Sequence, residues 1–263
     1  MELILVRHAE SIWNAEERWQ GQSDIPLSVR GEQEARKLAE RFAALEVDAV
    51  IASDLARAKD TAAAVLDARG KGALETHAGL REMNLGAWCG LPHAEVMSRF
   101  PDELAALARG DDDRRIGGDG ESLSAFSTRV HQALHEVCAA HSDAKRLMIV
   151  LHGGCIRSVL FALLGLKGRA RPLEGARNTS LTELVGVDAG KHLGVLKTYN
   201  DTLHLPPQET PRDGEDLLGE EGRARLVTLL GLSPTVPLAL PGPRARTTLD
   251  LRARRLVTYA VGA

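Results

Sequence analysis

Two short apolar runs stand out in the pattern of hydrophobic and polar positions. The first, over residues 3–6, leads into Arg7 and His8, and the second, over residues 147–151, leads into His152. Continuous apolar runs of this length are typical of buried strands in parallel sheets. Open α/β sheets bind ligands at the carboxyl ends of such strands. The pattern therefore predicts that the two histidines meet beside an arginine, at a site for an anionic ligand.

Helical and strand periodicities alternate between these runs and continue to about residue 205. Apolar residues at three- and four-residue spacings predict an amphipathic helix over about 32–45. A short strand over 47–52 precedes an alanine-rich helix, which Ser53 or Asp54 would cap. Further expected elements are a helix that Ser122 caps and that runs to about His141, a helix over 155–164, and strands over 182–187 and 192–199. This alternation predicts an α/β fold with a mainly parallel central sheet and helices on both faces.

The chain changes character after about residue 205. Prolines recur there, one helix is expected over about 214–230, and the last twenty residues hold five arginines against one acid, Asp250. We expect one domain over 1–205 and a Pro/Arg-rich extension over 206–263. That extension is either an interaction arm or lid, or an appendage that packs on the core or stays mobile.

Composition excludes several classes of partner. A net charge of −3 and 3% aromatic residues give no case for nucleic acid. The chain shows no signal peptide and no apolar run of membrane-spanning length, so we expect no membrane partner. Three cysteines without framework spacing are expected of a reduced, cytoplasmic protein. A homodimer is left open by the sequence.

Beyond the two histidines, small and polar residues recur in ordered blocks along about 180 residues. They are residues 5–11 with Asn14, Gln20, Gly21, Asp24, 26–28 and Gly31; 53–58 with Thr61; 80–86 with Trp88 and Gly90; 120–122; and 152–157 with 178–180. Together these blocks resemble the histidine phosphatase superfamily, which includes the cofactor-dependent phosphoglycerate mutases. The resemblance implies a three-layer phosphoglycerate mutase-like sandwich as the catalytic domain. It leaves the extension unexplained.

The resemblance also implies catalytic roles. His8 would attack phosphorus and form a phosphohistidine, which divides one difficult displacement into two steps. Arg7, Arg57 and His152 would neutralise the phosphoryl oxygens in the transition state. Glu82 would protonate the leaving oxygen and then activate the hydrolytic water, its proton arriving with the dianionic substrate.

A second set of residues is expected to bind the substrate. The backbone N–H of Gly153 and the side-chain amides of Asn14 and Gln20 would complete the anion cradle. Ser11 and Gly21 belong to the same entry block and are included in the substrate-binding set. Short polar residues in a loop also make turns, and that alternative stays open for Ser11, Asn14 and Gln20.

Other phosphate chemistries find little support. No cysteine is followed six positions later by arginine, and no Gly-x-x-x-x-Gly-Lys-Ser/Thr loop occurs. The acidic run 111–113 lacks a preceding apolar strand, so we expect a solvated loop and not an aspartyl-phosphate site. A metal site built from His8, His152 and Glu82 remains an alternative on residue type alone. We expect no metal and no cofactor.

The expected function is metal-independent phosphomonoester hydrolysis of small phosphorylated metabolites. Mutases of the family usually carry a Glu-Arg-x-Tyr-Gly-type sequence at the acid, whereas Glu82 is followed here by Met-Asn-Leu-Gly-Ala-Trp. An insertion at about 91–119 is expected to cap the site and select the substrate. A phosphoglycerate mutase and a non-catalytic phospholigand-binding regulatory protein are the alternatives.

Overall fold

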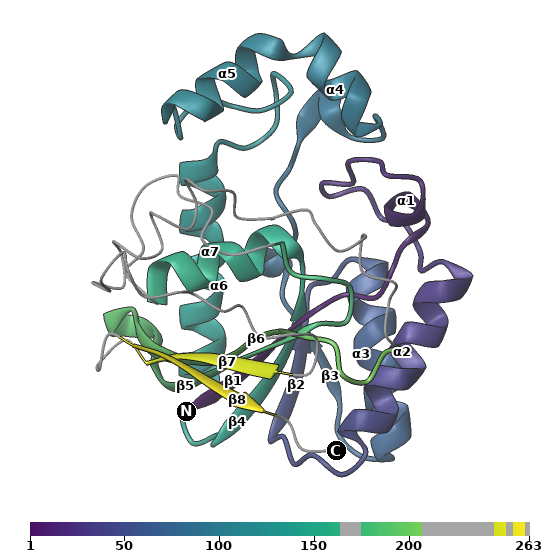
Figure 1. Ribbon diagram of the computed structural model, residues 1–263, viewed down its shortest axis with the longest axis vertical. Coiled ribbons are helices and arrows are strands. Elements are labelled where there is room, and N and C mark those ends of the chain that lie inside the picture. Colours follow the sequence, from purple (N-terminus) through teal and green to yellow (C-terminus); the bar gives the residue numbers. More distant parts are fainter. Residues whose placement is uncertain (164–174, 207–244, 251–254, 261–263) are drawn as a thin grey trace.

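The central sheet has six strands in the order β3-β2-β4-β1-β5-β6 (Figure 1). The computed structural model describes residues 1–163, 175–206, 245–250 and 255–260. The strands are β1 (Glu2–Arg7), β2 (Ala49–Ala52), β3 (Leu74–Thr76), β4 (Arg146–Leu151), β5 (Leu181–Asp188) and β6 (Leu193–Asp201). Strands β3, β2, β4 and β1 are parallel, which confirms the predicted α/β fold, while β5 and β6 add two antiparallel pairings at one side.

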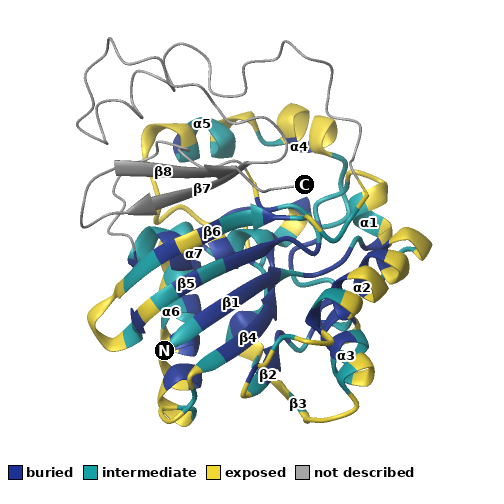
Figure 2. Cartoon of the chain, turned by 60° about the horizontal axis from the view of Figure 1, so that its bottom comes forward, coloured by how far each residue is buried: buried dark blue, intermediate teal, exposed yellow. Residues whose placement is uncertain are grey.

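Helices cover both faces of this sheet, as predicted. They are α2 (Val29–Phe42) and α3 (Ala56–Arg69) on one face, and α6 (Leu123–Ala140) and α7 (Gly153–Leu163) on the other. Alternate residues of a strand point to opposite faces. Thus Ile4 and Val6 pack in the core with α2 and α3, whereas Leu3 and Leu5 pack in the core with α6 and α7. Figure 2 shows β1 and β4 buried between the two layers.

A serine directly before the helix caps α2 and α6, whereas the side chain at the start of α3 comes from a separate loop. Ser28 accepts from the Gly31 N–H at 2.9 Å and starts α2 before the predicted boundary, and Ser122 caps α6 as predicted. The predicted cap of α3 by Ser53 or Asp54 is wrong, because the Ala56 N–H at its start donates to Asp24 Oδ1 at 2.6 Å. Local sequence pattern cannot identify a cap that comes from a distant loop.

The chain between β3 and α6 rises over the carboxyl ends of the parallel strands (Figure 1). It forms the 3₁₀ turns η1 (Ala78–Leu80) and η2 (Gly86–Trp88) and the helices α4 (His93–Arg99) and α5 (Pro101–Arg109). Aromatic contacts join this part of the chain to the loop that follows the short helix α1 (Ile12–Ala15). The ring centroid of Trp19 lies 4.7 Å from that of His93 in α4 and 5.7 Å from that of Trp88 in η2. Residues 111–113 are exposed, as expected.

The C-terminal part contributes a two-stranded antiparallel ribbon of β7 (Ala245–Asp250) and β8 (Arg255–Ala260), with β7 next to β6. No strand is predicted for these residues, which are expected to form an arm, a lid or an appendage. A 3₁₀ turn, η3 (Ala189–Lys191), joins β5 to β6. The helix expected over 214–230 lies outside the described residues. None of the described helices has the length and apolar character to cross a membrane.

Candidate active site

The carboxyl ends of β1 and β4 bring His8 and His152 together. These strands pair in parallel, with Arg7 opposite Leu151, so the residues beyond them leave the sheet side by side. The two imidazole rings lie 5.1 Å apart between centroids and are tilted by 58°. Both side chains are buried, with 3% of His8 and none of His152 exposed.

The contacts of His8 fix its tautomer. Its Nδ1 lies 2.7 Å from the Ala9 carbonyl oxygen, which accepts a proton only from a protonated Nδ1. The lone pair of the neutral ring is therefore on Nε2. Burial, followed by the charges of Arg57 and Arg7, lowers the pKa of His8 well below its ordinary value. His8 is thus a neutral imidazole at pH 7, the form that acts as a nucleophile.

Two arginines flank the histidines, Arg57 buried and Arg7 half-buried. Arg7 Nη1 donates to the Ala176 carbonyl at 2.6 Å. Arg57, on the first turn of α3, donates to the carbonyls of Ser23 and Gly21 at 2.7 and 2.9 Å. Burial lowers the pKa of Arg57 to about 10, which leaves the guanidinium charged at neutral pH. The backbone carbonyls hold both cations in fixed positions.

Unpaired polar atoms gather at this point of the molecule. Among the described residues, eight buried side-chain nitrogen or oxygen atoms have no hydrogen-bond partner, and four of them are Arg7 Nε, Arg57 Nε and both ring nitrogens of His152. Burying a polar group without a partner costs about 1–3 kcal/mol. Concentrated around one nucleophile, these groups fit a tetrahedral oxyanion whose oxygens accept from several directions.

Glu82 stands at the edge of the same cluster. Its Oε1 accepts from the Met83 N–H at 2.8 Å, and its Oε2 accepts from the Gly154 N–H at 3.0 Å. A Cβ atom at position 154 would overlap the Glu82 carboxylate, so the close approach requires glycine there. Glu82 acts electrostatically on both Arg7 and Arg57. The structure therefore brings together all five residues of the predicted catalytic set.

The predicted substrate-binding residues divide into two groups. Ser11 Oγ caps α1 and donates to Gln20 Oε1 at 2.7 Å, and the Ser11 N–H donates to Asn14 Oδ1 at 3.2 Å. Gly21, at φ +51°, supplies a carbonyl to Arg57. Ser11 and Gly21 thus hold their neighbours in place. The carboxamide oxygens of Asn14 and Gln20 are engaged, which leaves their NH2 groups as donors, and Gly153 opens α7 behind Arg7.

The structure adds support residues that the sequence did not assign to the site. Asn178 Nδ2 donates to the His8 carbonyl at 2.9 Å, and the Thr179 N–H donates to the Arg7 carbonyl at 3.0 Å. Thr179 has φ +53°, a conformation that is strained for a β-branched residue and is found mainly at functional sites. The block 178–180 was visible in the sequence, but nothing local indicated that it lies behind His8.

The part of the chain that the structure describes contains no group of three or more His, Cys, Asp or Glu side chains suited to a metal ion. Its cysteines, Cys89, Cys138 and Cys155, are free thiols. Burial raises the pKa of Cys155, which favours the protonated thiol.

Comparisons with known proteins agree with this geometry. The model of the histidine phosphatase superfamily (branch 1) matches residues 3–202. A "Probable phosphoglycerate mutase GpmB" of Enterobacter sp. (strain 638) is 38% identical over 187 residues, which are 70% of this chain and 84% of that protein. The corresponding protein of Salmonella choleraesuis is 36% identical over 78% of this chain and 95% of its own.

Solved structures with the same fold carry phosphatase names. A mycobacterial glucosyl-3-phosphoglycerate phosphatase in complex with VO3 has a TM-score of 0.68 and 30% identity, covering 76% of this chain and 99% of that one. A phosphoserine phosphatase of Entamoeba histolytica, with phosphoserine bound, has a TM-score of 0.68 and 26% identity over 78% and 99% of the two chains.

Proposed function

Since the chain belongs to the histidine phosphatase superfamily, we propose that it is a metal-independent phosphomonoester hydrolase that acts through a phosphohistidine on small phosphorylated metabolites. One observation carries the proposal. A neutral histidine, with its lone pair on Nε2, is surrounded by unpaired donors of Arg7, Arg57 and His152. That arrangement supplies a nucleophile and an anion cradle at the same point.

In the first step, His8 Nε2 forms a bond to phosphorus while the bond from phosphorus to the ester oxygen breaks. Arg7 and Arg57 carry charge opposite to that of the phosphoryl oxygens, with their unpaired Nε–H groups as additional donors. Glu82, in its protonated form, gives its proton to the leaving oxygen, so that an alcohol departs and a carboxylate remains. The Ala9 carbonyl stabilises the positive charge on the ring of His8 through Nδ1–H.

In the second step, water attacks the phosphohistidine. The Glu82 carboxylate accepts a proton from the water as its oxygen bonds to phosphorus, and the bond from phosphorus to Nε2 breaks. The products are inorganic phosphate, neutral His8 and protonated Glu82. The NH2 groups of Asn14 and Gln20 and the N–H of Gly153 supply the remaining donors to the phosphoryl group.

A phosphoglycerate mutase is the second candidate, favoured by the names of the relatives at 36–38% identity. The residues after Glu82 favour hydrolysis. Met83, Leu85 and Trp88, which follow the acid here in place of the mutase-type sequence, are buried in the core. The solved structures with 26–30% identity also carry phosphatase names.

The experiment is a screen of phosphomonoesters, including phosphoserine, 3-phosphoglycerate and glucosyl-3-phosphoglycerate, in the presence of a chelator. We expect phosphate release to exceed interconversion of 2- and 3-phosphoglycerate, without a bisphosphorylated primer. Rapid primer-dependent isomerisation with negligible phosphate release would assign the chain to the mutases. Binding of phosphate esters without any turnover would favour the non-catalytic alternative.

A further inference from the structure

The segment that carries Glu82 has no regular secondary structure to hold it. It runs from the 3₁₀ turn η1 to η2, outside the sheet, so its carbonyl groups find no partners in a strand ladder. Buried or half-buried backbone carbonyls need partners, and here side chains supply them. The partners decide how firmly the carboxylate of Glu82 is positioned.

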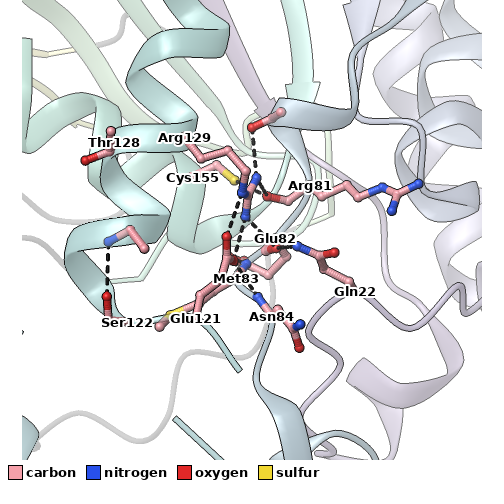
Figure 3. A network of polar contacts seen from close by, with 12 residues as sticks. Gln22, Arg81, Glu82, Met83, Asn84, Glu121, Ser122, Thr128, Arg129 and Cys155 are labelled. Carbon is pink, nitrogen blue, oxygen red and sulfur yellow. Dashed lines mark hydrogen bonds and ion pairs between the residues drawn. The ribbon is translucent and has the colours of Figure 1, made fainter. Parts of the chain in front are cut away.

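Arg129, in the middle of α6, supplies most of these partners (Figure 3). Its Nη1 donates to the carbonyls of Gly79 and Arg81, each at 2.9 Å, and its Nη2 donates to the carbonyl of Glu82 at 3.1 Å. Three carbonyls in a four-residue stretch thus converge on one guanidinium. Weak thiol contacts from Cys155, at 3.3–3.4 Å, reach the remaining carbonyl of this stretch and that of Arg81.

Glu121 completes the arrangement on the other side of Glu82. Arg129 Nε and Nη2 donate to the two oxygens of the Glu121 carboxylate, each at 2.8 Å. The same carboxylate accepts from the Asn84 N–H at 2.8 Å, while the Glu121 N–H donates to the Asn84 carbonyl at 2.7 Å. All five N–H bonds of the guanidinium are therefore used, and the segment is held both before and after Glu82.

We propose that Arg129, locked by Glu121, is a positioning residue that fixes the Glu82 carboxylate against the leaving oxygen. The inference rests on the proposed function, in which Glu82 is the proton donor. Arg129 donates to the backbone of Glu82 and not to its carboxylate, so it acts on the leaving oxygen through the position of Glu82. Its charge also acts on Glu82 and His152, and Arg129→Lys, which keeps that charge, separates the two effects. A misplacement of about 1 Å in such a group can cost about 100-fold in rate.

The test compares two esters in single-turnover measurements of His8 phosphorylation. An alkyl phosphate needs its leaving oxygen protonated, whereas nitrophenyl phosphate does not. For Arg129→Met we expect phosphorylation by the alkyl ester to slow by about 100-fold. The rate with nitrophenyl phosphate and the inhibition constant for inorganic phosphate should stay near those of the unmodified protein. Arg129→Lys and Glu121→Gln, which disturb the packing less, should show the same selectivity to a smaller degree.

Arg146→Met is the matched control. Arg146 forms a two-bonded ion pair with Glu2 at the opposite end of β1 and β4. Its loss should lower stability without changing the ratio of the two rates. In a Glu82→Gln background, Arg129→Met should add little further slowing, because the group that it positions is already absent.

The outcomes separate the two levels of the proposal. If Glu82→Gln slows only the alkyl ester but Arg129→Met slows both esters equally, or if the two effects simply add, Arg129 is a structural residue and the inference fails alone. If Glu82→Gln slows both esters equally, the assignment of Glu82 as proton donor fails and the inference fails with it.

Discussion

The backbone N–H of Gly154 donates to Glu82 Oε2 at 3.0 Å. This bond joins the N-terminal turn of α7, directly after His152, to the carboxylate proposed as the proton donor. The nucleophile, the anion cradle and the acid are therefore parts of one connected framework, and a change at a residue without a side chain should be felt in catalysis.

Gly154→Ala should reduce activity without reducing stability. A Cβ atom at this position would overlap the Glu82 carboxylate and push it aside. Displacement of the carboxylate is expected to slow turnover of alkyl esters by about 100-fold. Alanine is favoured over glycine in a helix by up to about 1 kcal/mol, so the free energy of unfolding should stay the same or rise. Urea unfolding and steady-state kinetics on one preparation check both. Unchanged kinetics would show that the bond to Gly154 does not position Glu82.

Gly31→Ala should do the opposite and lower stability. Gly31 lies on the first turn of α2, where an added Cβ would overlap the backbone carbonyl of Glu10 in the loop after His8. Overpacking of this kind costs about 1–3 kcal/mol. Glu32→Ala, an exposed change on the same turn, is the control and should alter the free energy of unfolding by less than about 0.5 kcal/mol. Equal effects of the two changes would contradict the steric account.

His204 should make the protein less stable in acid. Burial, followed by the charge of Arg41 and against the attraction of Asp201, lowers the pKa of His204 to about 4. Its ring also contacts the Thr179 hydroxyl, at 3.0 Å from Nε2. Between the ordinary value, near 6.5, and pH 4, the unfolded chain binds a proton here that the folded protein does not. Stability is therefore retained above pH 6.5 and lost as the pH falls toward 4.

The measurement is the free energy of unfolding across that range for the unmodified protein and for His204→Gln. The slope of the free energy of unfolding against pH should be smaller in the variant, by an amount that corresponds to at most one bound proton. His8 and His152, whose pKa values burial also lowers, contribute in the same direction in both proteins. Parallel curves would mean that His204 titrates alike in the folded and unfolded states.

Local sequence pattern was enough to predict the centre of the fold and the meeting of the two histidines. Apolar runs located β1 and β4, and their parallel ends predicted that His8 lies beside His152. The residues that hold the site in position could not be predicted from local pattern. Asp24 caps α3 from a separate loop, and Arg129 looks like an ordinary polar position of α6 until its carbonyl partners are known.

The antiparallel strand β5 shows the same limit. Its apolar alternation predicts a strand but not its direction, and the direction is what places Asn178 and Thr179 behind the backbone of His8. Contacts between distant segments determine which backbone groups are paired. Residues whose role is to satisfy those groups carry no pattern of their own in the sequence.

The central claim is that His8 Nε2 carries the phosphoryl group. The most direct measurement is rapid acid-free quenching after mixing with a radioactive phosphate ester, and then peptide mapping. The account predicts acid-labile, alkali-stable label on His8 that forms and decays at rates compatible with turnover, and no label and no turnover in His8→Ala. Turnover by His8→Ala, or label on a residue other than His8, would contradict the account.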